Sequence, residues 1–126
     1  MRLAFVTSVV IWAAAAQSNT VVTRRLTFPA GQSVVEQSGK ADYAMSYVWR
    51  FRAQKGQKVE ISLTSDGGRV KFSFSGDNTD TFRDGFLVDH WSGALPLTDD
   101  YNIVIVMNDE KAKNIAYRLR LRKADP

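Results

Sequence analysis

The feature that most restricts the fold of this chain is an alternation of apolar and polar side chains with a period of two, the period of a β-strand. Between residues 43 and 75 the alternation occurs in three successive runs, separated by glycine-containing turns at 54–57 and 66–68. The first run places five apolar side chains on one face: Tyr43, Met45, Tyr47, Trp49 and Phe51. We expect these runs to form three consecutive antiparallel strands.

The remaining segments add strands of the same kind. An initial strand ends at 26–28 before Pro29, and a short strand is expected at 86–88. Residues 101–107 are almost entirely apolar, which is typical of a strand covered on both faces, whereas 115–122 alternates again. No segment shows helical spacing, and 126 residues suffice for one domain. The sequence therefore predicts an all-β fold, an antiparallel, jelly-roll-like β-sandwich of about 7–8 strands.

The core of this sandwich should consist of the apolar side chains that share the inner faces of the strands. They are Tyr47, Trp49, Phe51, Val59, Ile61, Phe72, Phe74, Ile103, Ile105, Tyr117 and Leu119.

Residues 1–16 have the composition of a secretory signal peptide. Arg2 supplies the positive charge, residues 3–12 form an apolar run, and residues 13–16 are all alanine. The run is too short to span a bilayer, which takes about 20 apolar residues. We expect cleavage after Ala16, a single mature domain at 17–126, and a periplasmic or secreted location. The absence of cysteine favours a bacterial source for such an exported domain.

Catalytic chemistry is not indicated by the residue types present. The chain has one histidine, His90, no cysteine and no nucleophile motif, so we expect a binding protein without catalytic residues or a cofactor. Asp77, Asn78, Asp80 and Asp84 cluster in one loop, as calcium ligands do. Their spacing does not match a calcium-loop motif, and a solvated turn with no metal site is the favoured interpretation.

Five arginines on two strands would form a basic stripe if those strands were neighbours. They are Arg50 and Arg52 on one strand and Arg118, Arg120 and Arg122 on the other. Such a stripe binds phosphates or anionic glycans. The favoured alternative is the solvated face of a sheet, because the aromatic side chains that would stack on bases lie on the opposite face. We therefore expect neither a nucleic-acid partner nor a membrane span.

Two segments resemble a known family. "YVWRFRAQKGQKVEISL" at 47–63 has an aromatic strand, a K-G-Q turn and an alternating strand, and "WSGALPLTDDYNIVIVMNDEKAKNIAYRLRL" at 91–121 has an L-P turn and two tyrosine-containing strands joined by a polar loop. The pattern resembles the bacterial pre-peptidase C-terminal β-sandwich domain and, among exported single-domain proteins, the periplasmic inhibitors of g-type lysozyme.

The resemblance implies a protein partner, possibly a lysozyme, whose cleft would receive a surface loop. The corresponding loop here would supply the partner-binding residues Asn108, Asp109, Glu110, Lys111, Lys113 and Asn114. Lys111 and Lys113 would then meet cleft carboxylates. Two alternatives remain open at the level of sequence. One is a glycan-binding or accessory domain with His90 and Trp91 as its site, and the other is a structural envelope protein without a ligand.

Overall fold

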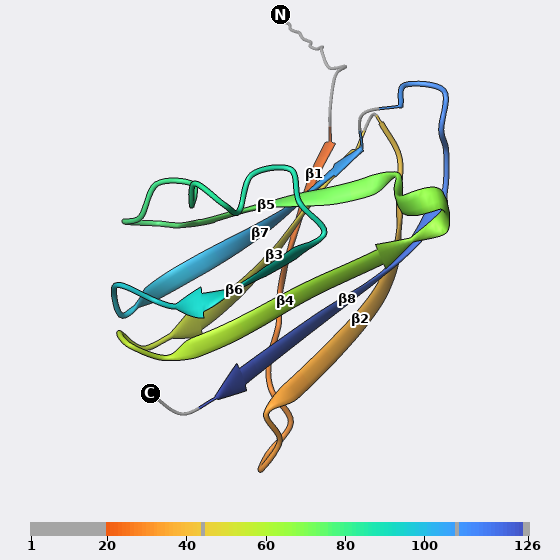
Figure 1. Ribbon diagram of the computed structural model, residues 1–126. Helices are drawn as coiled ribbons and strands as arrows, with labels where there is room; N and C mark the ends of the chain where they lie inside the picture. Colours follow the sequence, from red (N-terminus) through yellow and green to blue (C-terminus); the bar gives the residue numbers. More distant parts are fainter. Residues whose placement is uncertain (1–19, 44, 108, 125–126) are drawn as a thin grey trace, which may run out of the picture.

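The computed structural model describes residues 20–124 except 44 and 108. This part of the chain contains eight strands and a short 3-10 turn, η3 (Asp66–Gly68) (Figure 1). The strands are β1 (Thr20–Arg25), β2 (Val34–Ala41), β3 (Met45–Ala53), β4 (Lys58–Ser65), β5 (Val70–Gly76), β6 (His90–Ala94), β7 (Asp99–Met107) and β8 (Ile115–Ala124). The expected signal peptide, 1–16, lies outside the described residues. Within them, no helix is long and apolar enough to cross a membrane.

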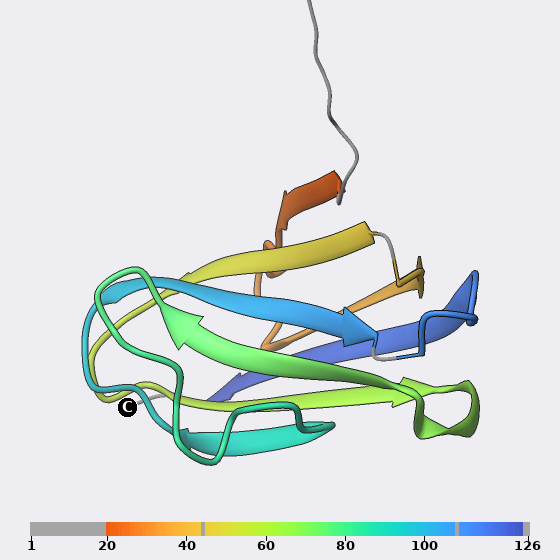
Figure 2. The ribbon, with the colours of Figure 1, turned by 90° about the horizontal axis from the view of Figure 1, so that it is seen from above.

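The strands form two four-stranded sheets that pack face to face (Figures 1 and 2). One has the order β1-β3-β7-β5 and the other β2-β8-β4-β6. The predicted all-β sandwich is thereby confirmed. One pairing departs from the expected antiparallel arrangement, because β1 runs parallel to β3. The chain reverses its direction between β1 and β2, which lies in the opposite sheet, and reverses again between β2 and β3. β3 therefore runs in the same direction as β1.

The three alternating runs between residues 43 and 75 are strands, but the prediction that they pair consecutively is wrong. β3 and β5 belong to one sheet, and β4 lies between them in sequence but in the other sheet. The turns at 54–57 and 66–68 therefore carry the chain across the sandwich. Crossing lets the apolar faces of successive strands bury one another, and alternation within a strand is the same whether its sequence neighbour lies beside it or opposite it.

Three local expectations also need correction. β2 was not predicted, because its outer and edge positions are mostly polar. Residue 88 makes only an isolated bridge to Phe72 instead of forming a strand at 86–88, and the strand occurs two residues later as β6. Tyr43 precedes β3 and is 51% exposed, so it does not share the core face.

The core lies between the sheets and matches the expected set. Each predicted residue is buried except Tyr47, which is partly buried and packs against the others. At one end the core is an aromatic cluster, in which the Phe74 ring lies 4.8 Å from both Phe82 and Trp91 and 6.0 Å from Phe51. Ring pairs at these separations add to the stabilisation that burial itself provides.

Candidate functional site

The loop between β7 and β8 extends beyond the end of both sheets (Figure 1). Asp109 organises it, because its side-chain Oδ1 accepts the Lys111 N–H at 3.0 Å and its carbonyl accepts the Ala112 N–H at 3.0 Å. Asn114 ends the loop with a φ of 53°, a left-handed conformation that asparagine adopts more readily than most residues. Asn108, also expected in the site, lies outside the described residues.

Two neighbouring turns hold this loop in place. The Asn114 N–H donates to the carboxylate of Asp42 in the β2–β3 turn. Arg69, which follows η3, approaches Asp109 with 3.9 Å between Nη1 and Oδ2. The Ala112 side chain is buried, so the middle of the loop is anchored to the core. These three connections lie at the same end of the sandwich (Figures 1 and 2).

The anchored loop leaves its charged side chains in solvent. Glu110, Lys111 and Lys113 are exposed, and a cavity of about 240 Å³ lies between Lys113 and the β2–β3 turn. Its lining comprises Asp42, Tyr43, Glu110, Ala112 and Lys113. The cavity thus combines one ammonium group, that of Lys113, with the carboxylates of Asp42 and Glu110 beside the exposed tyrosine ring.

Asp42, Tyr43 and Arg69 were not expected in this site. Asp42 and Arg69 lie about seventy and forty residues away from the loop in sequence, and only the sheet topology brings them together. Tyr43 carried a misleading signal, since it continues the alternation of β3 without belonging to that strand.

The alternative glycan site is contradicted by the burial of Trp91. Its indole is 5% exposed, packs against Phe74 and Phe82, and donates from Nε1 to Asp84 Oδ1 at 2.8 Å. No ring face therefore remains on which a sugar could stack. His90 points to the opposite side of β6, as adjacent strand residues must. It lies on the surface with its Nε2 3.1 Å from Glu60 Oε2, a hydrogen bond that lowers the pKa of Glu60.

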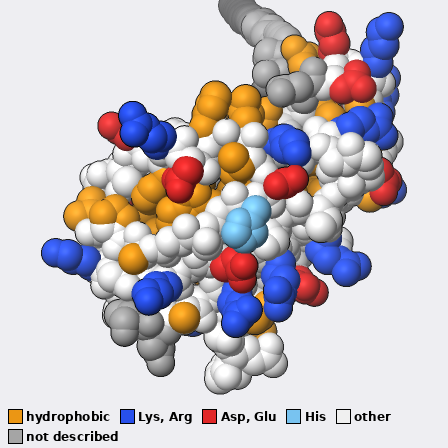
Figure 3. Space-filling view, in the orientation of Figure 1, with side chains coloured by type: hydrophobic (Ala, Val, Ile, Leu, Met, Phe, Trp, Pro, Cys, Tyr) orange, Lys and Arg blue, Asp and Glu red, His pale blue; other side chains and the backbone are white. Residues whose placement is uncertain are grey.

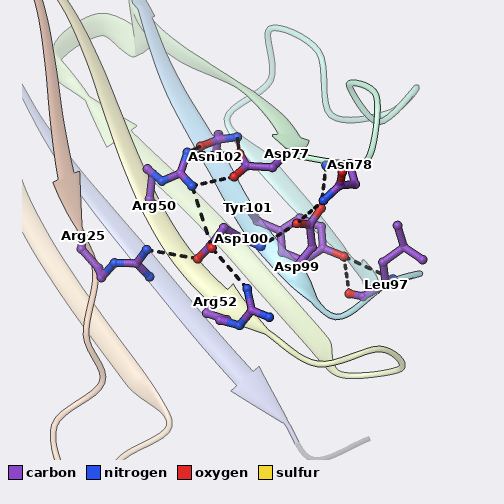
Figure 4. A network of polar contacts seen from close by, with 10 residues as sticks. All are labelled: Arg25, Arg50, Arg52, Asp77, Asn78, Leu97, Asp99, Asp100, Tyr101 and Asn102. Carbon is purple, nitrogen blue, oxygen red and sulfur yellow. Dashed lines mark hydrogen bonds and ion pairs between the residues drawn. The ribbon is translucent and has the colours of Figure 1, made fainter.

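In the acidic loop after β5, the carboxylate of Asp77 is bound by protein groups (Figure 4). Both carboxylate oxygens of Asp77 accept from Arg50, at 3.1 and 2.8 Å. This pairing, followed by the hydrogen bond from Asn102, lowers the pKa of Asp77. Nearby, Asp99 is buried and accepts the Asn78 N–H at 2.8 Å. In the described part of the chain, no group of three histidine or acidic side chains is arranged to hold a metal ion.

The basic stripe does not form, because its two strands are in different sheets. β3 places Arg50 and Arg52 on the outer face of one sheet, where both contact Asp100, at 4.0 and 3.2 Å. β8 exposes its arginines on the outer face of the other sheet. There Arg120 pairs with Glu36 at 3.5 Å and Arg122 with Glu60 at 3.7 Å. Figure 3 shows cationic and anionic side chains interspersed on this face, as expected for a solvated sheet surface.

Comparisons with solved structures identify the fold. PliG of Aeromonas hydrophila, a periplasmic lysozyme inhibitor of g-type lysozyme, matches with a TM-score of 0.72 and 14% identity, covering 85% of this chain and 100% of that one. PliG of Salmonella Typhimurium, with the same description, matches with a TM-score of 0.65 and 17% identity, covering 82% and 98%. The pre-peptidase C-terminal domain of a Bacillus anthracis collagenase matches with a TM-score of 0.50 and 10% identity, covering 86% and 100%.

These matches confirm the expected structural resemblance to both groups at the level of fold. No protein-family model matches the sequence, and no curated protein is significantly similar to it.

Proposed function

We propose that this protein is an exported binding protein that inhibits a g-type lysozyme by inserting the β7–β8 loop into the enzyme's cleft. The main support is the structural similarity to two PliG proteins, each matched over almost its whole length. Export of a mature chain 17–126 to the periplasm or medium is part of the proposal. The protein acts by binding and not by catalysis.

The loop is built for insertion into a preformed cleft. Its backbone is fixed by the Asp109 turn and tied to Asp42, so little conformational freedom is lost on binding. Lys111 and Lys113 project from this rigid base, and a glycosidase cleft carries the carboxylates that would receive them. Each ammonium is a compact point charge, so the loop would recognise charge and distance instead of a bidentate geometry.

Replacing Lys111 and Lys113 together by alanine should weaken inhibition. We expect a loss of about 2 kcal/mol or more, roughly thirtyfold in affinity, because truncation leaves buried cleft carboxylates unpaired. Lysis of cell walls by a g-type lysozyme, titrated with each variant, measures the change. Thermal melting should be unaffected, since exposed loop charges contribute little to stability.

The matched control is Lys55→Ala together with Lys58→Ala, two exposed lysines at the opposite end of the sandwich. It removes the same charge and should inhibit as the wild type does. Equal inhibition by the Lys111/Lys113 variant would show that the loop is not the recognition element. If the immobilised wild type retains no g-, c- or i-type lysozyme, lysozyme inhibition is wrong, and an accessory domain or a ligand-free structural protein becomes the better interpretation.

A further inference from the structure

A groove of about 670 Å³ lies along the open side of the sandwich, between β1 and β2. These are edge strands of different sheets, so among residues 20–124 as described no further strand closes the space between the layers there. The groove is lined by Arg24 and Arg25 of β1, residues 37–40 of β2, Tyr47 and Trp49 of β3, and Tyr117 of β8. It is separate from the cavity beside the β7–β8 loop, with which it shares no lining residue.

The register of β1 turns Arg24 toward the inside of the sandwich. Arg24 is paired with Trp49 of β3, and residues paired between neighbouring strands stand on the same face of a sheet. Trp49 is buried between the layers, so Arg24 is on the inner face, at its open margin. Arg25 has the opposite orientation, and its guanidinium is neutralised outside the groove by Asp100, with 3.1 Å between Nη2 and Oδ1.

The floor of the groove offers a hydrogen-bond donor. The Tyr117 hydroxyl accepts from Trp49 Nε1 at 3.1 Å, which leaves its own proton free to donate. Burial raises the pKa of Tyr117, an effect that the nearby positive charge of Arg24 opposes, and the hydroxyl is protonated at neutral pH. Gly39 makes room for this ring, because a Cβ there would lie 2.6 Å from the Tyr117 hydroxyl oxygen.

The charge of the groove is not balanced by carboxylates. Arg24 is the cation on the inner face, no acidic residue lines the groove, and within the described chain Arg24 has no carboxylate within 4.0 Å. Lys40 also borders the groove, but it is paired with the exposed Ala116 and its side chain stands on the outer face. Gln37, which is paired with the buried Leu119, stands on the inner face and can also donate. A guanidinium and neutral donors around one groove form an environment that stabilises an oxyanion.

We propose that the groove between β1 and β2 is a binding site for the oxyanion group of a small ligand, held chiefly by Arg24, with Gln37 and Tyr117 as further donors. The shared chemistry is that of carboxylate and phosphate groups. The site is independent of the proposed inhibition of lysozyme, because it uses different residues.

The test is titration of the purified protein with inorganic phosphate and, separately, with citrate, followed by amide chemical shifts. Sodium chloride at matched ionic strength controls for screening. We expect saturable shifts centred on residues 24 and 37–40. The dissociation constant should be at least about tenfold higher for Arg24→Gln, because this variant lacks the positively charged guanidinium group. Tighter binding of citrate would identify a carboxylate ligand, and tighter binding of phosphate a phosphoryl ligand.

Arg83→Gln provides the matched control, since it removes the same charge from an exposed position in the loop between β5 and β6. It should bind both anions as the wild type does. Failure of both anions to saturate, equal shifts in sodium chloride, or unchanged binding by Arg24→Gln would each overturn the proposal. None of these outcomes depends on inhibition of a lysozyme.

Discussion

At the residue scale, Trp49 on the inner face of β3 both packs in the core and makes a buried hydrogen bond. Trp49 is 7% exposed and fills the space between the sheets near the groove, where its indole N–H meets the Tyr117 hydroxyl. The two residues come from different sheets, so this hydrogen bond links the layers directly. A buried indole N–H without such a partner would destabilise the fold.

Replacing Trp49 by alanine should therefore lower the free energy of unfolding by about 3–5 kcal/mol, the usual loss for a large buried aromatic side chain. Trp49→Phe, which keeps most of the ring but removes the donor, should lose less. Urea denaturation of the wild type and both variants measures the difference. A loss well below 1 kcal/mol for the alanine variant would mean that Trp49 is not part of the core.

At the element scale, the sequence predicted most strands but not their partners. Alternation reports which face of a strand is apolar, and the buried sides of β3, β4 and β5 agree with it. It carries no information on whether β4 pairs with β3 or packs across from it, which is decided by long-range contacts. β2 was missed because its exposed edge positions are polar and Gly39 interrupts its inner face.

The candidate site could be predicted only in part for the same reason. The β7–β8 loop was located from a family resemblance and from the two strands that bracket it. Asp42 and Arg69, which hold that loop, come from other connections, and no spacing along the chain indicates their proximity. The buried Trp91 was misassigned because a tryptophan beside a histidine looks the same in sequence whether it lies in a core or on a surface.

The conformation of the β7–β8 loop should depend on Asn114. Its φ of 53° lies in the left-handed region, where a residue with a Cβ and no compensating hydrogen-bonding side chain is strained by roughly 1–2 kcal/mol. Asn114→Ala should thus destabilise the protein by about 1 kcal/mol, whereas Asn114→Gly should be close to neutral. Thermal or urea melts compare the two variants with Glu110→Ala, an exposed change in the same loop. Equal stability of the alanine and glycine variants would contradict this account.

At the scale of the whole molecule, the sheets are joined by a core and covered by faces on which opposite charges are paired. The network in Figure 4 connects β1, β3, β7 and the loop after β5 through Arg25, Arg50, Asp77 and Asp100. The chain as a whole is cationic, with a net charge of +4. Exposed pairs of this kind add little stability individually, so their joint effect should be seen mainly in the response of the fold to pH.

The fold should lose stability in acid. The hydrogen bond from the Asn78 backbone N–H lowers the pKa of Asp99 below 3.8. Arg50 lowers the pKa of Asp77 below 3.8, and His90 lowers that of Glu60 below 4.5. A carboxyl group whose pKa is lower in the folded state than in the unfolded state stabilises the fold fully above its unfolded value. This contribution is lost as the pH falls through the folded pKa. Urea midpoints measured from neutral pH downward should therefore hold until the unfolded values are reached and then fall.

Asp99 should account for a distinct part of this loss of stability in acid. It is the one buried carboxylate in the described chain, and it accepts three hydrogen bonds, two from Asn78 and one from the Asp100 N–H. Asp99→Asn should be less stable than the wild type at neutral pH, since an amide oxygen replaces only part of the acceptor capacity. Its midpoint should then decline less between neutral and acid pH, because the titrating group is gone. Asp80→Asn, an exposed substitution in the neighbouring loop, is the control and should follow the wild-type curve. If Asp99→Asn declines as steeply as the wild type, the acid sensitivity comes from other carboxylates, and the buried Asp99 network does not carry it.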